Sequence, residues 1–204
     1  MDKPRLLPLD DSPFWVEPED ICARLDWSAV FPVARPIEID LGAGDGGFIG
    51  VAALQRREIN FLGVERLLGR ARKIARKAAR EKLDNLKVLR LESAYVVQYL
   101  LPAGSVSVIH LMFPDPWPKR RHWGNRIIQP DFMMTVAAAL RLGGEFRFTT
   151  DHEEYFNLGS LVIDGCPGLT RAPVWEFKND PPTDFQKDFE AEGRKTYRAR
   201  WLKK

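Results

Sequence analysis

The residues with the clearest chemical potential form a short run, Phe113–His122, with the sequence FPDPWPKRRH. The run follows seven mostly apolar residues, 106–112, that are typical of a buried strand. Three prolines exclude a helix and remove three backbone donors, so we expect a stiff loop at the end of that strand. Ligands of open α/β sheets bind beyond the carboxyl ends of the strands. A rigid carboxylate, an indole and several cations at this position indicate chemistry on a base carried by a polyanion.

A glycine-rich turn forms a second candidate site. Gly42, Gly44 and Gly47 follow the expected strand 37–41 and open a helix-like segment. This spacing fits a dinucleotide-binding turn and an S-adenosylmethionine-binding turn alike, and a plain strand-to-helix turn is the alternative for the glycines alone. Asp40 favours S-adenosylmethionine, because a carboxylate ahead of the glycines repels a pyrophosphate and attracts the positive amino-acid end of that cofactor.

Two further acids follow the next two expected strands. Glu65 lies nineteen residues after Gly46, where a carboxylate can bind two ribose hydroxyls. Glu92, followed by Ser93, is placed to contact the adenine edge. With Asp40, these acids predict a cofactor site. No metal is expected, because the three histidines are dispersed and the two cysteines have no metal-ligand spacing.

Apolar runs and helical patterns alternate between residues 37 and 163, which predicts a doubly wound, mostly parallel α/β sheet. The expected strands are 37–41, 61–65, 86–91, 106–112 and 144–149, and the expected helices are 45–57, 66–83, 94–101, 130–140 and 153–163. Residues 195–201 alternate like a strand, which fits an antiparallel pair at the sheet edge. The helix after Glu65 carries cations on one face, which is either a phosphate track or, more commonly, a solvated face. Better phosphate candidates by their place in the chain are Arg194, Lys195, Arg198 and Arg200.

Length and composition fit one domain with an appendage. The 204 residues are 45% hydrophobic and 29% charged, which is ordinary for a globular protein. Residues 1–36 predict an N-terminal arm with a short helix near 17–25, and residues 37–204 predict the domain. Residues 1–26 hold seven acids and three bases, so a net charge of +3 leaves +7 on the remainder, which permits a nucleic-acid partner. We expect a cytoplasmic protein, because the sequence has no membrane-length apolar run, no signal-peptide pattern and only two distant cysteines.

The chain resembles the bacterial tRNA (guanine-N7)-methyltransferases. The resemblance rests on the FPDPWPKRRH run, the glycine turn and the segment Thr150–Tyr155 (TDHEEY), and it extends from residue 37 to the C-terminus. It implies a Rossmann-like class I methyltransferase with a mostly parallel, seven-stranded sheet and an antiparallel edge strand. It also implies methyl transfer from S-adenosylmethionine to N7 of guanosine 46 in the variable loop of tRNA. Monomer and homodimer both stay open.

The candidate site residues fall into two groups. Asp115 matches the residue regarded as catalytic in the family. The cofactor-binding residues are predicted to be Asp40, Gly42, Gly44, Glu65, Glu92, Ser93 and Asp115. The substrate-binding residues are predicted to be Lys119, Arg121, His122, Arg126, Asp151, Thr183 and Gln186.

Three departures from the family pattern concern these groups. Gln186 stands where a glutamate is expected, so it keeps an accepting oxygen but loses the charge. Glu92-Ser93 replaces a usual Asp-Ala pair, and residues 122–126 hold fewer cations than the family's basic run. These departures leave open the alternative that the chain is an RNA-binding paralogue that has lost methyl transfer.

Two other readings remain as alternatives. Asp115-Pro116-Trp117 half matches the Asp-Pro-Pro-aromatic signature of enzymes that methylate exocyclic amines, and the missing second proline counts against that activity. An NAD dehydrogenase is disfavoured by Asp40. Trp117 either stacks on the target base or packs under the proline-rich loop.

Overall fold

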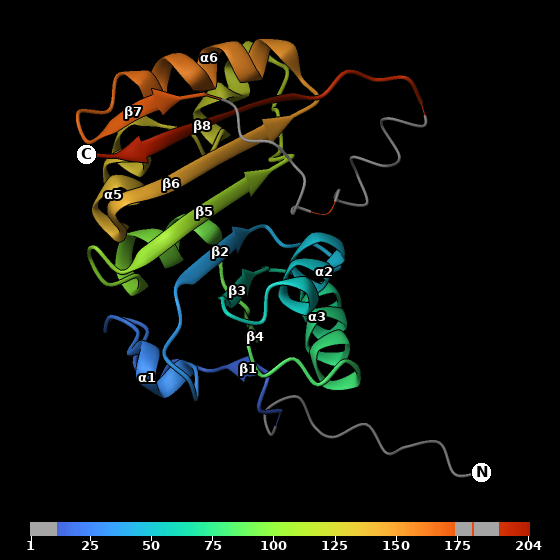
Figure 1. Ribbon diagram of the computed structural model, residues 1–204. Helices are drawn as coiled ribbons and strands as arrows, with labels where there is room; N and C mark the ends of the chain where they lie inside the picture. The colour runs from blue at the N-terminus through green and yellow to red at the C-terminus, as the bar shows by residue number, and fades with distance from the viewer. Residues whose placement is uncertain (1–11, 174–180, 182–191) are drawn as a thin grey trace.

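A single sheet of eight strands organises the computed structural model, which describes residues 12–173, 181 and 192–204 (Figure 1). The strands are β1 (Trp15–Val16), β2 (Ile37–Leu41), β3 (Asn60–Val64), β4 (Leu86–Leu89), β5 (Val106–Met112), β6 (Leu140–Thr150), β7 (Leu169–Ala172) and β8 (Tyr197–Lys203). Their spatial order is β1-β4-β3-β2-β5-β6-β8-β7. The pairings from β1 to β6 are parallel, whereas β8 runs antiparallel to both β6 and β7. This confirms the predicted doubly wound sheet and the antiparallel pair at its edge.

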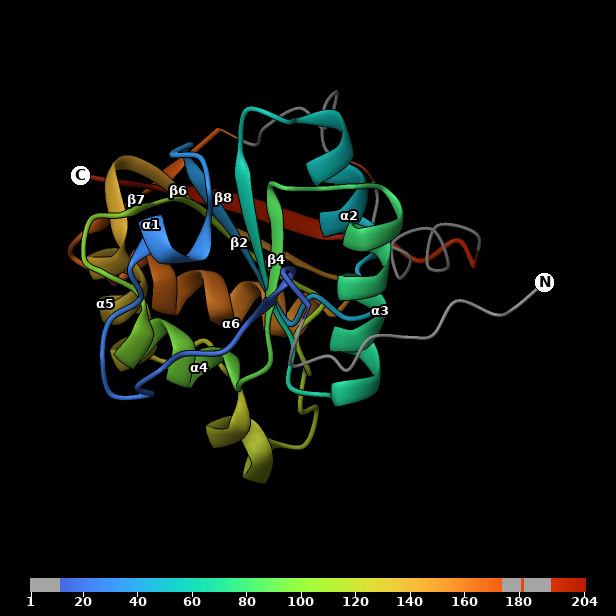
Figure 2. The ribbon, with the colours of Figure 1, turned by 90° about the horizontal axis from the view of Figure 1, so that it is seen from below.

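Helices cover the sheet on two faces (Figure 2). The helical elements are α1 (Trp27–Val30), α2 (Gly47–Gln55), α3 (Leu68–Arg80), α4 (Ser93–Tyr95), the π-helix η2 (Val96–Leu100), the 3-10 helix η3 (Arg120–Asn125), α5 (Pro130–Ala139) and α6 (Glu153–Asp164). Helices α2 and α3 pack on one face, and η2, α5 and α6 pack on the other. No helix in the described ranges is both long and apolar enough to span a bilayer.

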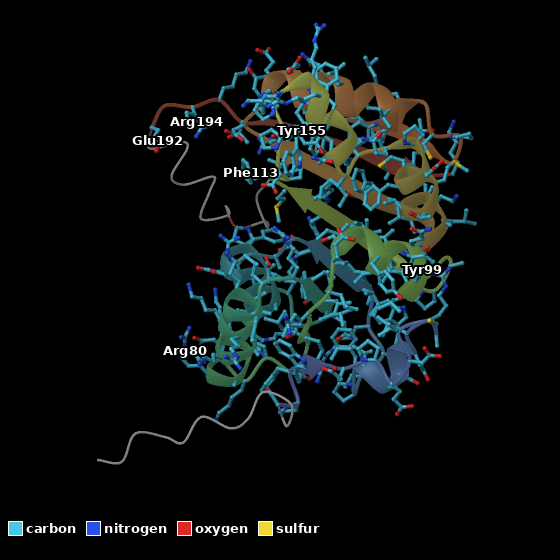
Figure 3. All side chains as sticks on the ribbon, turned by 180° about the vertical axis from the view of Figure 1, so that it is seen from behind. Arg80, Tyr99, Phe113, Tyr155, Glu192 and Arg194 are labelled. Carbon is cyan, nitrogen blue, oxygen red and sulfur yellow. The ribbon has the colours of Figure 1, made fainter. Side chains whose placement is uncertain are left out.

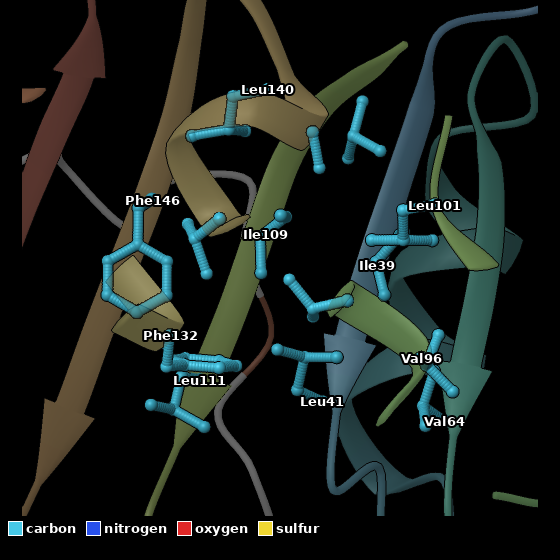
Figure 4. Close-up of a cluster of buried hydrophobic side chains, with 14 of the residues drawn as sticks. Ile39, Leu41, Val64, Val96, Leu101, Ile109, Leu111, Phe132, Leu140 and Phe146 are labelled. Atoms are coloured by element: carbon cyan, nitrogen blue, oxygen red, sulfur yellow. The ribbon is translucent and has the colours of Figure 1, made fainter. Parts of the chain in front are cut away.

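The central strands are buried along their whole length because helices cover both faces of the sheet. All five residues of β2 and all five of β3 are buried. On the face of α5 and η2, side chains such as Ile39, Ile109 and Phe146 form the larger core cluster (Figure 4). This packing fixes the strand ends from which the candidate site residues project.

Small residues bring α2 and α3 close together and close to the sheet. The buried stripe of α3 consists of Ala71, Ile74, Ala75 and Ala78. Gly46, directly ahead of α2, has a φ of 79°, and a Cβ atom there would lie 2.8 Å from Cγ1 of Ile74. The turn therefore requires glycine at this position, both for its backbone conformation and for its contact with α3.

The N-terminal segment differs from the expectation in two ways. Trp15 and Val16 pair with β4 and add an eighth strand to the seven expected. The predicted helix near 17–25 is not formed: the Asp20 side chain accepts a hydrogen bond from the Cys22 amide at 2.7 Å, which favours a local turn over a helix. The nearest helix is α1, which begins after Asp26, whose side chain caps it.

Candidate active site

The acids predicted from sequence meet at one edge of the sheet. Asp40 lies near the end of β2, Glu65 follows β3, Glu92 follows β4, Asp115 follows β5 and Asp151 follows β6. Because β2 to β6 are parallel, these positions share the carboxyl edge, where ligands of such sheets bind. The topology therefore brings together five acids that are separated by up to 111 positions in the chain.

Glu65 is held rigidly beside the glycine turn. One carboxylate oxygen accepts from the Gly44 amide at 3.0 Å, and the other accepts from the Leu67 amide at 2.8 Å. Gly42 and Gly44 have φ angles of 78° and 57°, and a Cβ atom at either would meet nothing within 4 Å. The turn therefore leaves open space beside a buried carboxylate whose orientation is fixed by backbone donors.

Asp40 is a buried acid with an unused oxygen. Its exposed fraction is 2%, and its Oδ1 atom has no hydrogen-bond partner among the described residues. Burial, and secondarily the charge of Glu65, raises the pKa of Asp40 to about 7. Leaving a buried carboxylate unpaired is unfavourable, so a cationic ligand group next to Oδ1 would remove a penalty. Asp40, the open glycine turn and Glu65 thus fit a cofactor with an ammonium group and a diol, as S-adenosylmethionine has.

The loop that carries Asp115 is bent by two residues in the left-handed region. Phe113 and Trp117 have φ angles of 50° and 42°, which is unusual for non-glycine residues. The Phe113 amide donates to the Thr149 carbonyl at 2.8 Å and so extends the β5–β6 pairing into the loop. Between these bends the Asp115 side chain is exposed. Figure 3 shows Phe113 at the same end of the molecule as Tyr155 and Arg194.

Arg126 binds the backbone of this loop through a buried side chain. Its Nε donates to the Pro116 carbonyl at 2.8 Å, and the guanidinium carbon lies 4.7 Å from the ring centre of Trp123 and 4.8 Å from that of Tyr155. The side chain is only 4% exposed. The resemblance implies a substrate contact here, whereas the structure gives Arg126 a buried contact with the loop. Backbone carbonyls, two aromatic faces and the Glu154 carboxylate at 3.8 Å surround its guanidinium group. The sequence pattern predicts no contact of Arg126 with either ring, because Tyr155 is 29 positions away and the spacing of Trp123 does not show that its ring faces the guanidinium group.

The other substrate candidates on the side of β5 lie on η3 or directly ahead of it, and they are exposed except for His122, which is partly buried. Lys119 and Arg121 are exposed, and Arg121 contacts His122, with Nε and Nε2 3.2 Å apart. His122 also packs edge-on against Trp117, with ring centres 5.8 Å apart. The proline-rich run is therefore a loop only up to Lys119, since Arg120 begins η3.

Asp151 forms an ion pair with Arg194, which lies just ahead of β8. Arg194 is also 3.6 Å from a carboxylate oxygen of Glu192. Sequence reasoning named both Asp151 and Arg194 but did not pair them, because they are 43 positions apart.

Glu92 caps α4: its carboxylate accepts from the Tyr95 amide at 2.8 Å, and the side chain is exposed at the site edge. Ser93 begins that helix. Thr183 and Gln186 lie outside the described residues.

Comparisons with known proteins place the chain in a methyltransferase family. Residues 34–199 match the family described as "Putative methyltransferase". The tRNA (guanine-N(7)-)-methyltransferase of Streptococcus uberis is 33% identical over 199 residues, which cover 94% of this chain and 92% of that protein. The enzyme of the same name from Geobacter metallireducens is 32% identical over 78% of this chain and 74% of that protein.

Solved structures agree on the fold. The crystal structure of the 16S rRNA methyltransferase KamB matches with a TM-score of 0.62 and 16% identity, covering 87% of this chain and 93% of that one. An antibiotic-related methyltransferase matches with a TM-score of 0.61 and 20% identity, covering 86% and 90%. These likenesses concern the fold alone, whereas the sequence similarity is specific: the chain belongs to the tRNA (guanine-N7)-methyltransferase family.

Proposed function

We propose that this protein transfers a methyl group from S-adenosylmethionine to N7 of guanosine 46 in tRNA. The observation that supports the proposal best is the placement of Asp115. Its exposed carboxylate lies at the same sheet edge as the buried, unpaired Asp40, in a chain of this family. Asp40 suits the cationic methyl donor, and Asp115 suits the guanine that accepts the methyl group.

The cofactor would be held on the side of β2, β3 and β4. Asp40 would accept from its ammonium group, Glu65 would accept from its ribose, and the turn at Gly42 and Gly44 would let it lie against the backbone. Glu65 keeps this capacity because each carboxylate oxygen can accept a second hydrogen bond. Glu92 and Ser93 border the adenine end. When bound, the cofactor supplies an electrophilic methyl group on a sulfonium.

The chemistry requires alignment more than proton transfer. Guanine N7 has a free lone pair in the neutral base, so no general base is needed to make it a nucleophile. Holding the two reactants in line can contribute up to about 7–11 kcal/mol. During transfer, positive charge develops on the imidazole ring of the base. A fixed carboxylate at Asp115 stabilises that charge and accepts from exocyclic amino groups.

The substrate would be held on the side of β5 and β6. Lys119, Arg121 and His122 present donors to the RNA next to Asp115. Asp151, paired with Arg194 in this structure, would exchange part of that ion pair for contacts with the substrate. Thr183 and Gln186 complete the proposed substrate set, and Gln186 would accept from the guanine edge through its amide oxygen.

Methyl transfer to defined tRNA tests the proposal. Two unmodified transcripts that differ only at position 46, guanine against adenine, are incubated with the protein and radiolabelled S-adenosylmethionine. We expect label only in the guanine transcript, and strand cleavage at that position after reduction and aniline treatment. Equal labelling of both transcripts would contradict the position, and label without cleavage would indicate an exocyclic amine instead.

A further inference from the structure

Helix α3 has an unusual charge pattern. Its thirteen residues include six cations and no acid: Arg70, Arg72, Lys73, Arg76, Lys77 and Arg80. The alanine and isoleucine stripe faces the sheet, so the charged side chains lie on the outer surface of the helix. Arg66, just ahead of α3, is also exposed.

This pattern opposes the stability of the helix. Like charges four positions apart, as in the pairs Arg72–Arg76 and Arg76–Arg80, repel each other on a helix surface. Cations in the first turn also interact unfavourably with the helix dipole, and α3 has neither an acid in that turn nor a side-chain cap at Leu67. A segment that breaks local rules without a structural gain is expected at functional sites.

The fold satisfies only some of these cations. Those with partners are Arg70 and Lys73 with Asp45, Lys77 with the Gly46 carbonyl, and Arg80 with Glu81. Arg72 and Arg76 are exposed, and across the described residues their guanidinium groups make no ion pair or hydrogen bond. These two arginines therefore contribute repulsion to α3 and receive no compensating contact within the described fold.

The helix starts at the candidate active site. The Leu67 amide donates to Glu65, so the first turn of α3 adjoins the cofactor side of the site. Thirteen residues of α-helix extend about 20 Å. Figure 3 shows Arg80 at the end of α3 that lies far from Phe113. A polyanion with one nucleotide in the site can therefore follow this helix with its backbone.

We propose that Arg66, Arg72 and Arg76, named here the α3 ridge, bind backbone phosphates of the RNA whose guanine is methylated. This inference rests on the proposed function and specifies a part of its substrate surface. Guanidinium groups suit phosphates because their planar donors bind two oxygens at once. A membrane surface is less suitable, because an interfacial helix needs a large exposed apolar face and the apolar stripe of α3 is buried against the sheet.

The test removes the two unpaired cations. In Arg72→Gln/Arg76→Gln, glutamine keeps a helix propensity close to that of arginine. The control is Lys203→Gln/Lys204→Gln, which removes the same charge at the C-terminal end of β8, near the opposite edge of the sheet from the strands that α3 covers. Each variant and the wild type are titrated with unmodified tRNA between 50 and 200 mM salt. Cofactor affinity and melting temperature are measured in parallel.

We expect the ridge variant to bind tRNA roughly tenfold more weakly, and the slope of log K against log salt to fall by about 1.5, because two phosphate contacts are lost. Its melting temperature should be equal to or higher than that of the wild type, because repulsion within α3 is relieved. The control should match the wild type in tRNA affinity and slope. A ridge variant with unchanged slope, or a control variant equally weakened, would overturn the proposal.

Two further outcomes separate this inference from the proposed function. If the wild type binds tRNA through the ridge but labels no guanine, the proposed function fails and the ridge stands. If the ridge variant methylates tRNA like the wild type but loses binding to vesicles containing phosphatidylserine, the ridge serves a membrane and the RNA proposal is overturned.

Discussion

The two sides of the candidate site are built in different ways. On the side of β2 and β3, Glu65 is buried and bound by two backbone amides, and Asp40 is buried without a partner. On the side of β5 and β6, Asp115 is exposed on a bent loop, and Asp151 pairs with a side chain from the segment ahead of β8. One side is set by local backbone geometry and the other by contacts between distant side chains.

The difference corresponds to the sizes of the two proposed ligands. A small cofactor contacts few groups, so its affinity depends on a preformed cradle. A large RNA brings many phosphates and can replace protein ion pairs with its own contacts. We therefore expect substitutions on the cofactor side to change affinity for one small molecule, and those on the substrate side to divide between rate, loop stability and RNA binding.

The largest effect is expected at Asp115. Asp115→Asn removes the charge but keeps the shape, so transfer should slow roughly 100-fold or more, as when one preorganised electrostatic group is removed from an active site. Affinity for S-adenosylmethionine should stay within a few-fold of the wild type. Single-turnover methylation and calorimetric titration of the cofactor measure the two effects. Wild-type turnover in this variant would reduce Asp115 to a structural residue of the loop.

The second effect concerns Asp40 and depends on pH. Its folded pKa of about 7 lies above the ordinary value of 3.8, so the folded protein holds a proton that the unfolded chain releases. Stability from this group is therefore present below about pH 4 and is lost as the pH rises to about 7, by at most about 4 kcal/mol. Asp40→Asn should remove this loss and make the cofactor-free protein more stable than the wild type at pH 8.

The same substitution should weaken cofactor binding at least tenfold, because an amide does not attract an ammonium group as a carboxylate does. Urea unfolding at pH 4 and pH 8 measures the expected gain in stability, and cofactor titration measures the expected loss of affinity. Asp84→Asn is the matched control, since Asp84 is exposed and pairs with Arg35 at the surface. If the wild type and Asp40→Asn lost the same stability between the two pH values, burial of Asp40 would not be the cause.

Sequence reasoning succeeded where a pattern is local. The bounds of β2 and β5 were predicted to the residue, because both are rich in Ile, Val and Leu and end at a glycine turn or a proline loop. The convergence of Asp40, Glu65 and Asp115 followed from the parallel topology alone. The positions of the acids relative to the sheet edge can thus be predicted from the sequence.

The sequence did not predict features that depend on tertiary contacts. The pattern around Arg126 is basic and polar, and only the structure shows Trp123 and Tyr155 on either side of its guanidinium group. Residues 17–25 contain helix-compatible residues, but an Asp20 turn and the pairing of Trp15 with β4 select an extended path. The ion pair of Asp151 with Arg194 joins segments whose proximity depends on the antiparallel insertion of β8.

A smaller effect is expected at Arg126. Arg126→Gln leaves the Pro116 carbonyl without its buried donor, which should destabilise the fold by about 1–3 kcal/mol and release the Asp115 loop. Arg121→Gln on the exposed face of η3 is the control and should change stability by less than about 0.5 kcal/mol. Urea unfolding measures both. The slope of log K against log salt for tRNA binding should stay unchanged in Arg126→Gln, because a buried guanidinium group makes no phosphate contact; a slope that falls by about 1 would mean that Arg126 contacts the RNA.

The smallest expected effect is the coupling between Asp151 and Arg194. It tests most directly whether the substrate side of the site is less rigid than the cofactor side. Their side chains are 16% and 46% exposed, so solvent screens the ion pair. A double-mutant cycle with Asp151→Asn and Arg194→Gln should give a coupling of less than about 1 kcal/mol in the free protein. Such a weak pair can open when RNA binds. A coupling above about 2 kcal/mol would mean that the substrate side is as rigid as the cradle around Glu65, because pairs of that strength occur where charges are desolvated and held by fixed geometry.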